Sequence, residues 1–170
     1  MEPAKARDGL RVAASHNNLG VKMLPYNLSD VRRAPAMFFP RSTYDEAVAF
    51  VMGIDETTHH SFLLGFKEWL AIKASTHEEF HWNYHWSGVL PILVFPSSPK
   101  WREMPELNAH TVLIDFLFQQ LEEFLDARKQ PDGMRTIYLR YQECLEDQDW
   151  YFPGSPHWIE HRVGSKASKN

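Results

Sequence analysis

Residues 108–129 read NAHTVLIDFLFQQLEEFLDARK, and this stretch decides the fold. Apolar side chains recur in it at the spacing of one helical face: Ile114, Leu117, Phe118, Leu121, Phe124 and Leu125. Polar and charged residues occupy the opposite side, so the pattern predicts an amphipathic α-helix whose apolar stripe needs a partner surface. We therefore expect one long helix around which the rest of the chain packs.

Other stretches also carry helical patterns. Thr43 and Glu46 have the spacing of a capping box, which predicts a helix that begins after Thr43 and ends near Gly53. Residues 61–74 and residues 134–147 repeat apolar side chains at helical spacing, so each is expected to form a helix with one buried face.

Residues 88–95 form the most apolar run of the chain, and the pattern alone leaves their structure open. Their β-branched residues favour a strand, but Pro91 cannot donate to a sheet ladder. If Gly88 caps a helix instead, Pro91 falls in the first turn, where its missing N–H is harmless. The neighbouring helices favour this second interpretation. The whole sequence thus predicts a mainly α fold, a single-domain bundle of about four or five helices with at most a short strand pair.

Length and composition suit one globular domain. The chain has 170 residues, of which 44% are hydrophobic, an ordinary share for a folded protein. Residues 1–19 are polar, rich in alanine and without periodicity, so we expect a flexible N-terminal segment. Residues 20–160 are expected to form the α-rich domain, and residues 161–170 a flexible basic tail.

Charge and cysteine content narrow the classes of partner and compartment. A net charge of −4, with no basic stripe, argues against a nucleic-acid binder. Cys144 is the only cysteine, so no intrachain disulfide can form and the cytoplasm is the expected compartment. No apolar run reaches the roughly 20 residues that span a bilayer, so we expect no membrane partner. Aromatic residues make up 14% of the chain, a surplus that allows a homodimer.

The sharpest chemical motif is His77-Glu78-Glu79-Phe80-His81, a match to H-E-x-x-H. On a helix both histidines would share one face and bind Zn²⁺, Glu78 would activate the bound water, and His85 would continue the ligand spacing. Two features weaken this interpretation. Glu79 stands where such helices carry an apolar residue, and a capping box would place His77 at a helix start. Residues 157–161 match the inverted order H-x-x-E-H.

The competing interpretation makes the same region a recognition surface. Glu79 would combine with the aromatic side chains of Trp82, Tyr84 and Trp86, an arrangement of acid and aromatic groups that suits a basic protein partner. Small acidic proteins of this character include bacterial immunity and antitoxin proteins, which neutralise a partner. The likeness is one of character and identifies no family.

Other catalytic designs have little support in the sequence. Cys144 falls on the apolar face of its predicted helix, where a thiol behaves as a small hydrophobic group. Neither of the glycine-rich phosphate-binding motifs occurs. The leading prediction is therefore a non-catalytic protein-binding module of immunity or antitoxin type that needs no cofactor. A zinc-dependent hydrolase that uses Glu78 with the nearby histidines is the alternative.

Overall fold

The structure, a computed structural model, describes residues 27–98, 100–103, 108–152 and 154, and within these ranges it contains helices but no strand. The elements in chain order are α1 (Leu28–Arg33), η1 (Pro35–Met37), α2 (Tyr44–Thr57), α3 (Phe66–Ala74), α4 (Trp86–Val94), η2 (Trp101–Glu103), α5 (Ala109–Lys129) and α6 (Gly133–Glu146). The η elements are short 3₁₀ turns. The predicted mainly α fold is confirmed, and the strand pair that the sequence left open does not form in this part of the chain.

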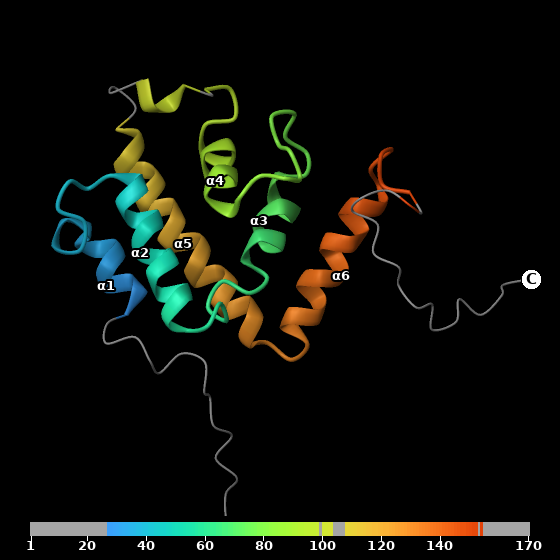
Figure 1. Ribbon diagram of the computed structural model, residues 1–170, viewed down its shortest axis with the longest axis horizontal. Coiled ribbons are helices and arrows are strands. Elements are labelled where there is room, and N and C mark those ends of the chain that lie inside the picture. Colours follow the sequence, from blue (N-terminus) through green and yellow to red (C-terminus); the bar gives the residue numbers. More distant parts are fainter. Residues whose placement is uncertain (1–26, 99, 104–107, 153, 155–170) are drawn as a thin grey trace, which may run out of the picture.

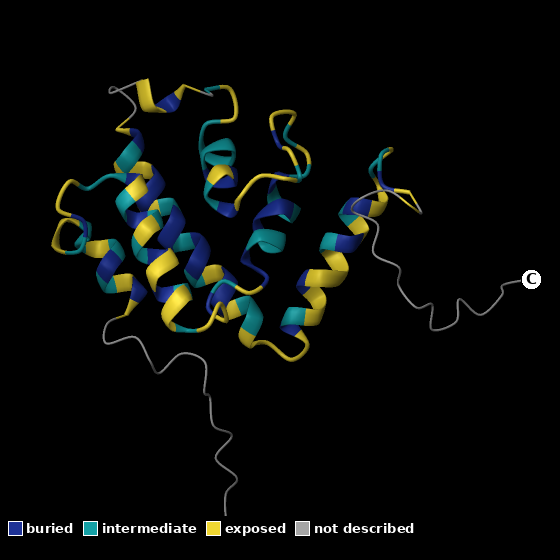
Figure 2. Cartoon of the chain, viewed as in Figure 1, coloured by how far each residue is buried: buried dark blue, intermediate teal, exposed yellow. Residues whose placement is uncertain are grey.

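Helix α5 is the element on which the others pack. It has 21 residues and contacts α1, α2, α3, α4 and α6 (Figure 1). The whole predicted stripe is buried, with Phe118 and Phe124 fully enclosed, and buried residues recur along α5 in Figure 2. The apolar face is wide enough that helices lie on more than one side of α5, which is why this stretch organises the core.

Helix α2 begins at the predicted capping box. The Thr43 hydroxyl accepts from the Glu46 amide at 3.3 Å, and the Glu46 carboxylate accepts from the Thr43 amide at 3.3 Å. The helix does not stop near Gly53 as predicted, but continues to Thr57. Gly53 is exposed and does not adopt a left-handed backbone conformation. It therefore lowers the stability of the helix relative to alanine but does not end it.

Helix α3 begins later than the sequence predicts. Gly65 has φ +87°, a left-handed conformation that interrupts the predicted helix over residues 61–74, so the helical residues start at Phe66. The preceding loop is held by Arg128, whose guanidinium donates to the carbonyls of Ser61 and Phe62 at 2.8 and 3.0 Å. The side chain of Met134 approaches Gly65 closely, because a Cβ at this position would lie 2.9 Å from Cε of Met134.

The apolar run is helical over residues 88–94, as the favoured interpretation held, and Phe95 caps the end of the helix. However, α4 starts at Trp86, so Pro91 lies inside the helix, beyond the first turn in which it was expected. His85 precedes the helix, and its Nδ1 accepts from the Ser87 amide at 3.4 Å. Val89 and Leu90 are fully buried, and α4 packs on both α3 and α5. This position brings the outer side of α4 toward the start of α2.

Helix α6 completes the described part of the chain and packs against α3 and α5 (Figure 1). Ile137 and Leu145 are buried on the apolar face of α6, whereas Cys144, which was predicted to lie on that face, is only partly buried. Beyond the helix, the Tyr151 hydroxyl exchanges buried hydrogen bonds with the Gln142 amide group at 3.0 and 3.3 Å. Among the described helices, none has both the length and the apolar character needed to cross a bilayer.

Candidate functional site

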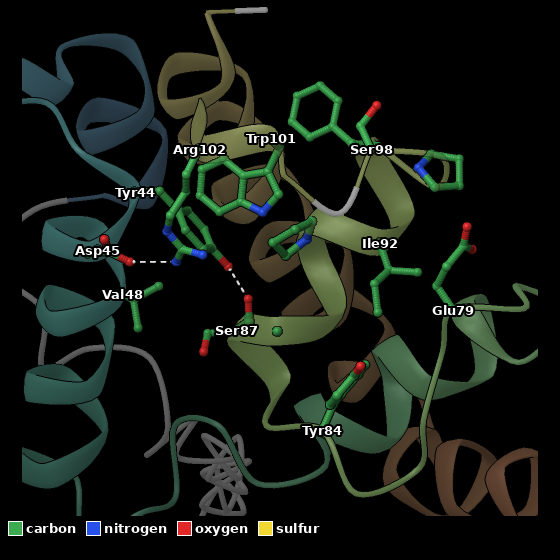
Figure 3. Close-up of a pocket in the computed structure, with 14 residues that line it drawn as sticks. Tyr44, Asp45, Val48, Glu79, Tyr84, Ser87, Ile92, Ser98, Trp101 and Arg102 are labelled. Carbon is green, nitrogen blue, oxygen red and sulfur yellow. Dashed lines mark hydrogen bonds and ion pairs between the residues drawn. The ribbon is translucent and has the colours of Figure 1, made fainter. Parts of the chain in front are cut away.

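An open pocket of about 290 Å³ lies between the start of α2, the outer side of α4 and the turn η2 (Figure 3). We call it the α2–α4 groove. Its apolar and aromatic lining includes Val48, Tyr84, Pro91, Ile92, Phe95 and Trp101. Its polar lining includes Tyr44, Asp45, Glu79, Ser87, Ser98 and Arg102. Concave sites with mostly apolar walls and a few polar groups are the usual form of ligand sites in proteins.

Trp101 forms one wall of the α2–α4 groove and is itself buried. Its ring meets the rings of Tyr44 and His110 edge to face, with centroids 5.9 and 5.6 Å away. The Arg102 guanidinium covers the indole at 4.2 Å from the ring centroid and donates to the Asp45 carboxylate at 3.1 Å. These contacts join η2 to the first turn of α2 and hold the indole in place.

Tyr44 connects α2 to α4, the opposite side of the groove, and to α5. Its hydroxyl donates to the carbonyl of Ser87 at 2.7 Å, a bond drawn in Figure 3. Its amide donates to Nδ1 of His110 at 3.1 Å, which satisfies one of the amides left without an intrahelical acceptor in the first turn of α2. Burial raises the pKa of the Tyr44 hydroxyl well above its ordinary value, so this side chain remains a neutral donor.

Glu79 and Tyr84 reach the groove from the connection between α3 and α4. Both side chains are exposed, and Tyr84 is 37% accessible. Among the residues that the structure describes, the Glu79 carboxylate has no ion pair or hydrogen bond. In contrast, the carboxylate of Asp45 is occupied by Arg102. Glu79 is therefore the acidic group of the groove that is free to meet a cation.

The predicted metal ligands do not come together. Residues 75–85 form turns and contain no helical residue, so His77 and His81 do not share a helix face. The ring of Phe80 is buried, and its centroid lies 5.1 Å from the centroid of the Trp82 ring. This packing holds the segment in turns and not in a helix. No group of three or more His, Cys, Asp or Glu side chains in the described ranges could hold a metal ion. The helical geometry on which the zinc-hydrolase alternative depends is thus absent here.

The other residues of that hypothesis have different surroundings. Glu78 is exposed and does not line the α2–α4 groove. His85 lies before α4, and its Nδ1 is 2.8 Å from the Ser87 hydroxyl. Burial, assisted by the charge of Lys67, lowers the pKa of His85 below its ordinary value. The second motif, over residues 157–161, lies outside the described residues.

The structure separates the predicted partner-binding residues into two groups. Glu79 and Tyr84 line the α2–α4 groove. Trp86 is buried and packs against Phe66 with ring centroids 5.7 Å apart, so its ring belongs to the core. Trp82 is half-buried between the rings of Phe80, Tyr141 and Trp150, away from the groove lining.

Sequence reasoning missed the opposite wall, which Asp45, Trp101 and Arg102 form. Trp101 offered the one local signal, because a large aromatic residue in a proline-rich loop needs a surface on which to pack. No family model, curated protein or solved structure matches this chain.

Proposed function

We propose that this protein is a non-catalytic binding module that holds a basic segment of a protein partner in the α2–α4 groove. The observation that carries the proposal is the position of Glu79, a carboxylate without a partner among the described residues, which lines the rim of an aromatic pocket that Tyr84 also lines. Aromatic side chains supply contact area at low entropic cost, and an acidic rim selects a cationic partner.

The overall charge supports the same kind of partner. The chain carries a net charge of −4, which favours encounter with a basic protein over encounter with an acidic one. A neutralising role in the cytoplasm, of the kind that immunity and antitoxin proteins have, is the form of this function that we propose. The groove would then cover a basic region of the partner, and a single side chain at the rim would strongly affect recognition.

The proposal is tested by affinity capture from the native host with variants of the full chain as bait. Glu79→Lys reverses the charge at the rim, and we expect it to abolish stoichiometric recovery of a basic partner. Glu78→Lys is the matched control because it changes the net charge equally, is exposed, and does not line the groove. We expect it to recover the partner at the level of the unaltered protein.

The two variants separate local recognition from a general charge effect. If both lose the partner equally, long-range attraction explains the capture and the groove does not. If Glu79→Lys recovers a basic partner as well as the unaltered protein does, the proposed site is wrong. Recovery of no stoichiometric basic partner by any of the baits would contradict the proposed function itself.

A further inference from the structure

Building on the proposed function, we infer that the segment held in the α2–α4 groove is proline-rich, adopts a polyproline II helix, and places a lysine or arginine beside Glu79. Three features of the groove support this inference: its walls, its hydrogen-bonding groups and the arrangement of charge along it.

The walls have the composition that polyproline segments recognise. Tyr84 and Phe95 contribute aromatic rings, and Pro91 adds a flat apolar surface. Trp101 is buried beneath the Arg102 guanidinium and contributes only the part of its indole that lines the groove. Aromatic grooves bind polyproline II helices because the rings of the ligand pack between them and because a proline-rich chain loses little entropy on binding. The volume of about 290 Å³ lies at the lower end of the range for ligand clefts, and it suits a thin extended chain better than an α-helix, which is about 10 Å wide.

The hydrogen-bonding groups also suit such a chain. Figure 3 draws the indole nitrogen of Trp101 on the side of the ring that faces the groove. Among the described residues this N–H has no hydrogen-bond acceptor. Its nitrogen is not fully buried, so a ligand can reach it. A polyproline II helix has no internal hydrogen bonds, so its carbonyl oxygens remain free to accept from the indole.

The two ends of the groove differ in charge. Figure 3 shows Asp45 and Arg102 at one end and Glu79 at the other. Arg102 neutralises Asp45 through their 3.1 Å ion pair, whereas Glu79 has no partner in the described part of the chain. A chain that lies across the groove therefore meets one end at which the acidic charge is neutralised and one end at which it is not. We place its cationic residue at the second end, beside Glu79.

The inference is tested with the synthetic peptide acetyl-Pro-Pro-Leu-Pro-Pro-Arg-Pro-amide and the purified full chain, by calorimetric titration. The comparison peptide replaces each proline by glycine and keeps the leucine and the arginine. We expect the proline peptide to bind and the glycine peptide to bind at least about tenfold more weakly, because the glycine chain must be ordered on binding. We expect Glu79→Lys to weaken binding of the proline peptide by about tenfold or more, and Glu78→Lys to leave it unchanged.

A further variant tests the hydrogen bond. Trp101→Phe keeps an aromatic ring in the wall and removes the donor, so we expect weaker binding of the proline peptide. Its thermal unfolding is measured in parallel. If Trp101→Phe unfolds at the assay temperature, the titration is repeated with Tyr84→Ala, which removes an exposed aromatic wall and is likewise expected to weaken binding.

Equal binding of the two peptides overturns the polyproline inference and leaves the proposed function standing, because a basic segment still binds. Binding of the proline peptide that Glu79→Lys does not weaken, or absence of binding by the proline peptide, also overturns the inference. In those cases the capture experiment with the native host still decides the proposed function independently.

Discussion

The hydroxyl of Tyr44 donates, at 2.7 Å, to the carbonyl of Ser87, the residue four positions before Pro91. In an α-helix this carbonyl accepts from the amide four residues later, and a proline has no amide hydrogen to give. The first residue of α2 therefore replaces a backbone bond that α4 lacks. This substitution explains how Pro91 is accommodated inside α4, and it joins the two helices that form the α2–α4 groove.

Replacing Tyr44 by phenylalanine tests this relationship. Tyr44→Phe leaves the carbonyl of Ser87 without its donor, so we expect the free energy of unfolding to fall by about 1 kcal/mol. Urea denaturation of the full chain measures the change. In a Pro91→Ala background the new amide can bond to the Ser87 carbonyl, so the same replacement should cost less there. Equal losses in the two backgrounds would show that the tyrosine does not compensate for the proline.

His110 provides a second test of the start of α2. Its Nδ1 accepts from the Tyr44 amide at 3.1 Å, so His110→Ala removes an acceptor from the first turn. We expect a loss of about 1 kcal/mol in unfolding free energy. His110→Asn can place an oxygen near the same position and should recover much of that loss. If alanine and asparagine are equally destabilising, ring packing against Trp101 is the important contribution.

Most of the core could be predicted from the sequence, because helical periodicity is a local signal. The stripe of α5 and the capping box of α2 depend on residues a few positions apart, and both are present. The start of α3 could not be predicted in this way. It depends on the left-handed backbone of Gly65. A glycine permits that conformation but does not require it.

The glycines at positions 65 and 53 should respond oppositely to alanine. Gly65 has φ +87°, and a Cβ there would lie 2.9 Å from Cε of Met134, so Gly65→Ala should lower the unfolding free energy by about 1–2 kcal/mol. A Cβ at Gly53 would meet nothing within 4 Å, and the residue lies inside α2. Gly53→Ala should therefore raise stability by about 0.5–1 kcal/mol. Thermal denaturation measures both changes, and changes of the same sign would contradict the assigned backbone geometry.

The ion pair between α3 and α5 predicts a pH dependence. Lys73 donates to Glu123 at 2.7 Å, and this bond is the main reason that the pKa of Glu123 lies below its ordinary value of 4.5. As the pH falls below 4.5, the carboxylate protonates first in the unfolded chain. The contribution to stability is thus complete above that pH and is lost as the pH falls through the lowered pKa of the folded state.

Glu123→Gln removes this titration. We expect the melting temperature of the variant to fall less steeply below pH 4.5 than that of the unaltered protein. Glu143→Gln is the control, because Glu143 is exposed and has no ion pair within the described residues. An unchanged slope for Glu123→Gln would mean that solvent screens the pair, whose side chains are partly exposed.

The candidate site was harder to predict than the core because it is assembled from distant segments. The sequence pointed to Glu79 and Tyr84 through their acid and aromatic character, and both lie in the groove. The sequence also grouped Trp86 with them, but the Trp86 ring is buried in the core. Adjacency along the chain does not show which side chains of a turn face the core. The zinc motif depended on a helix. Whether residues 75–85 would be helical was decided by tertiary packing of Phe80 and not by histidine spacing.

The central claim is that a protein partner contacts the α2–α4 groove, and site-specific photocrosslinking in the native host tests it most directly. The photoreactive residue p-benzoylphenylalanine replaces Tyr84 in one variant and Tyr138 in another. These tyrosines are similarly exposed, at 37% and 40%, but Tyr138 lies on α6, outside the groove. We predict one defined protein adduct from position 84, which disappears when Glu79→Lys is added, and none from position 138. An adduct from position 138 alone, or no adduct from position 84, would contradict the account.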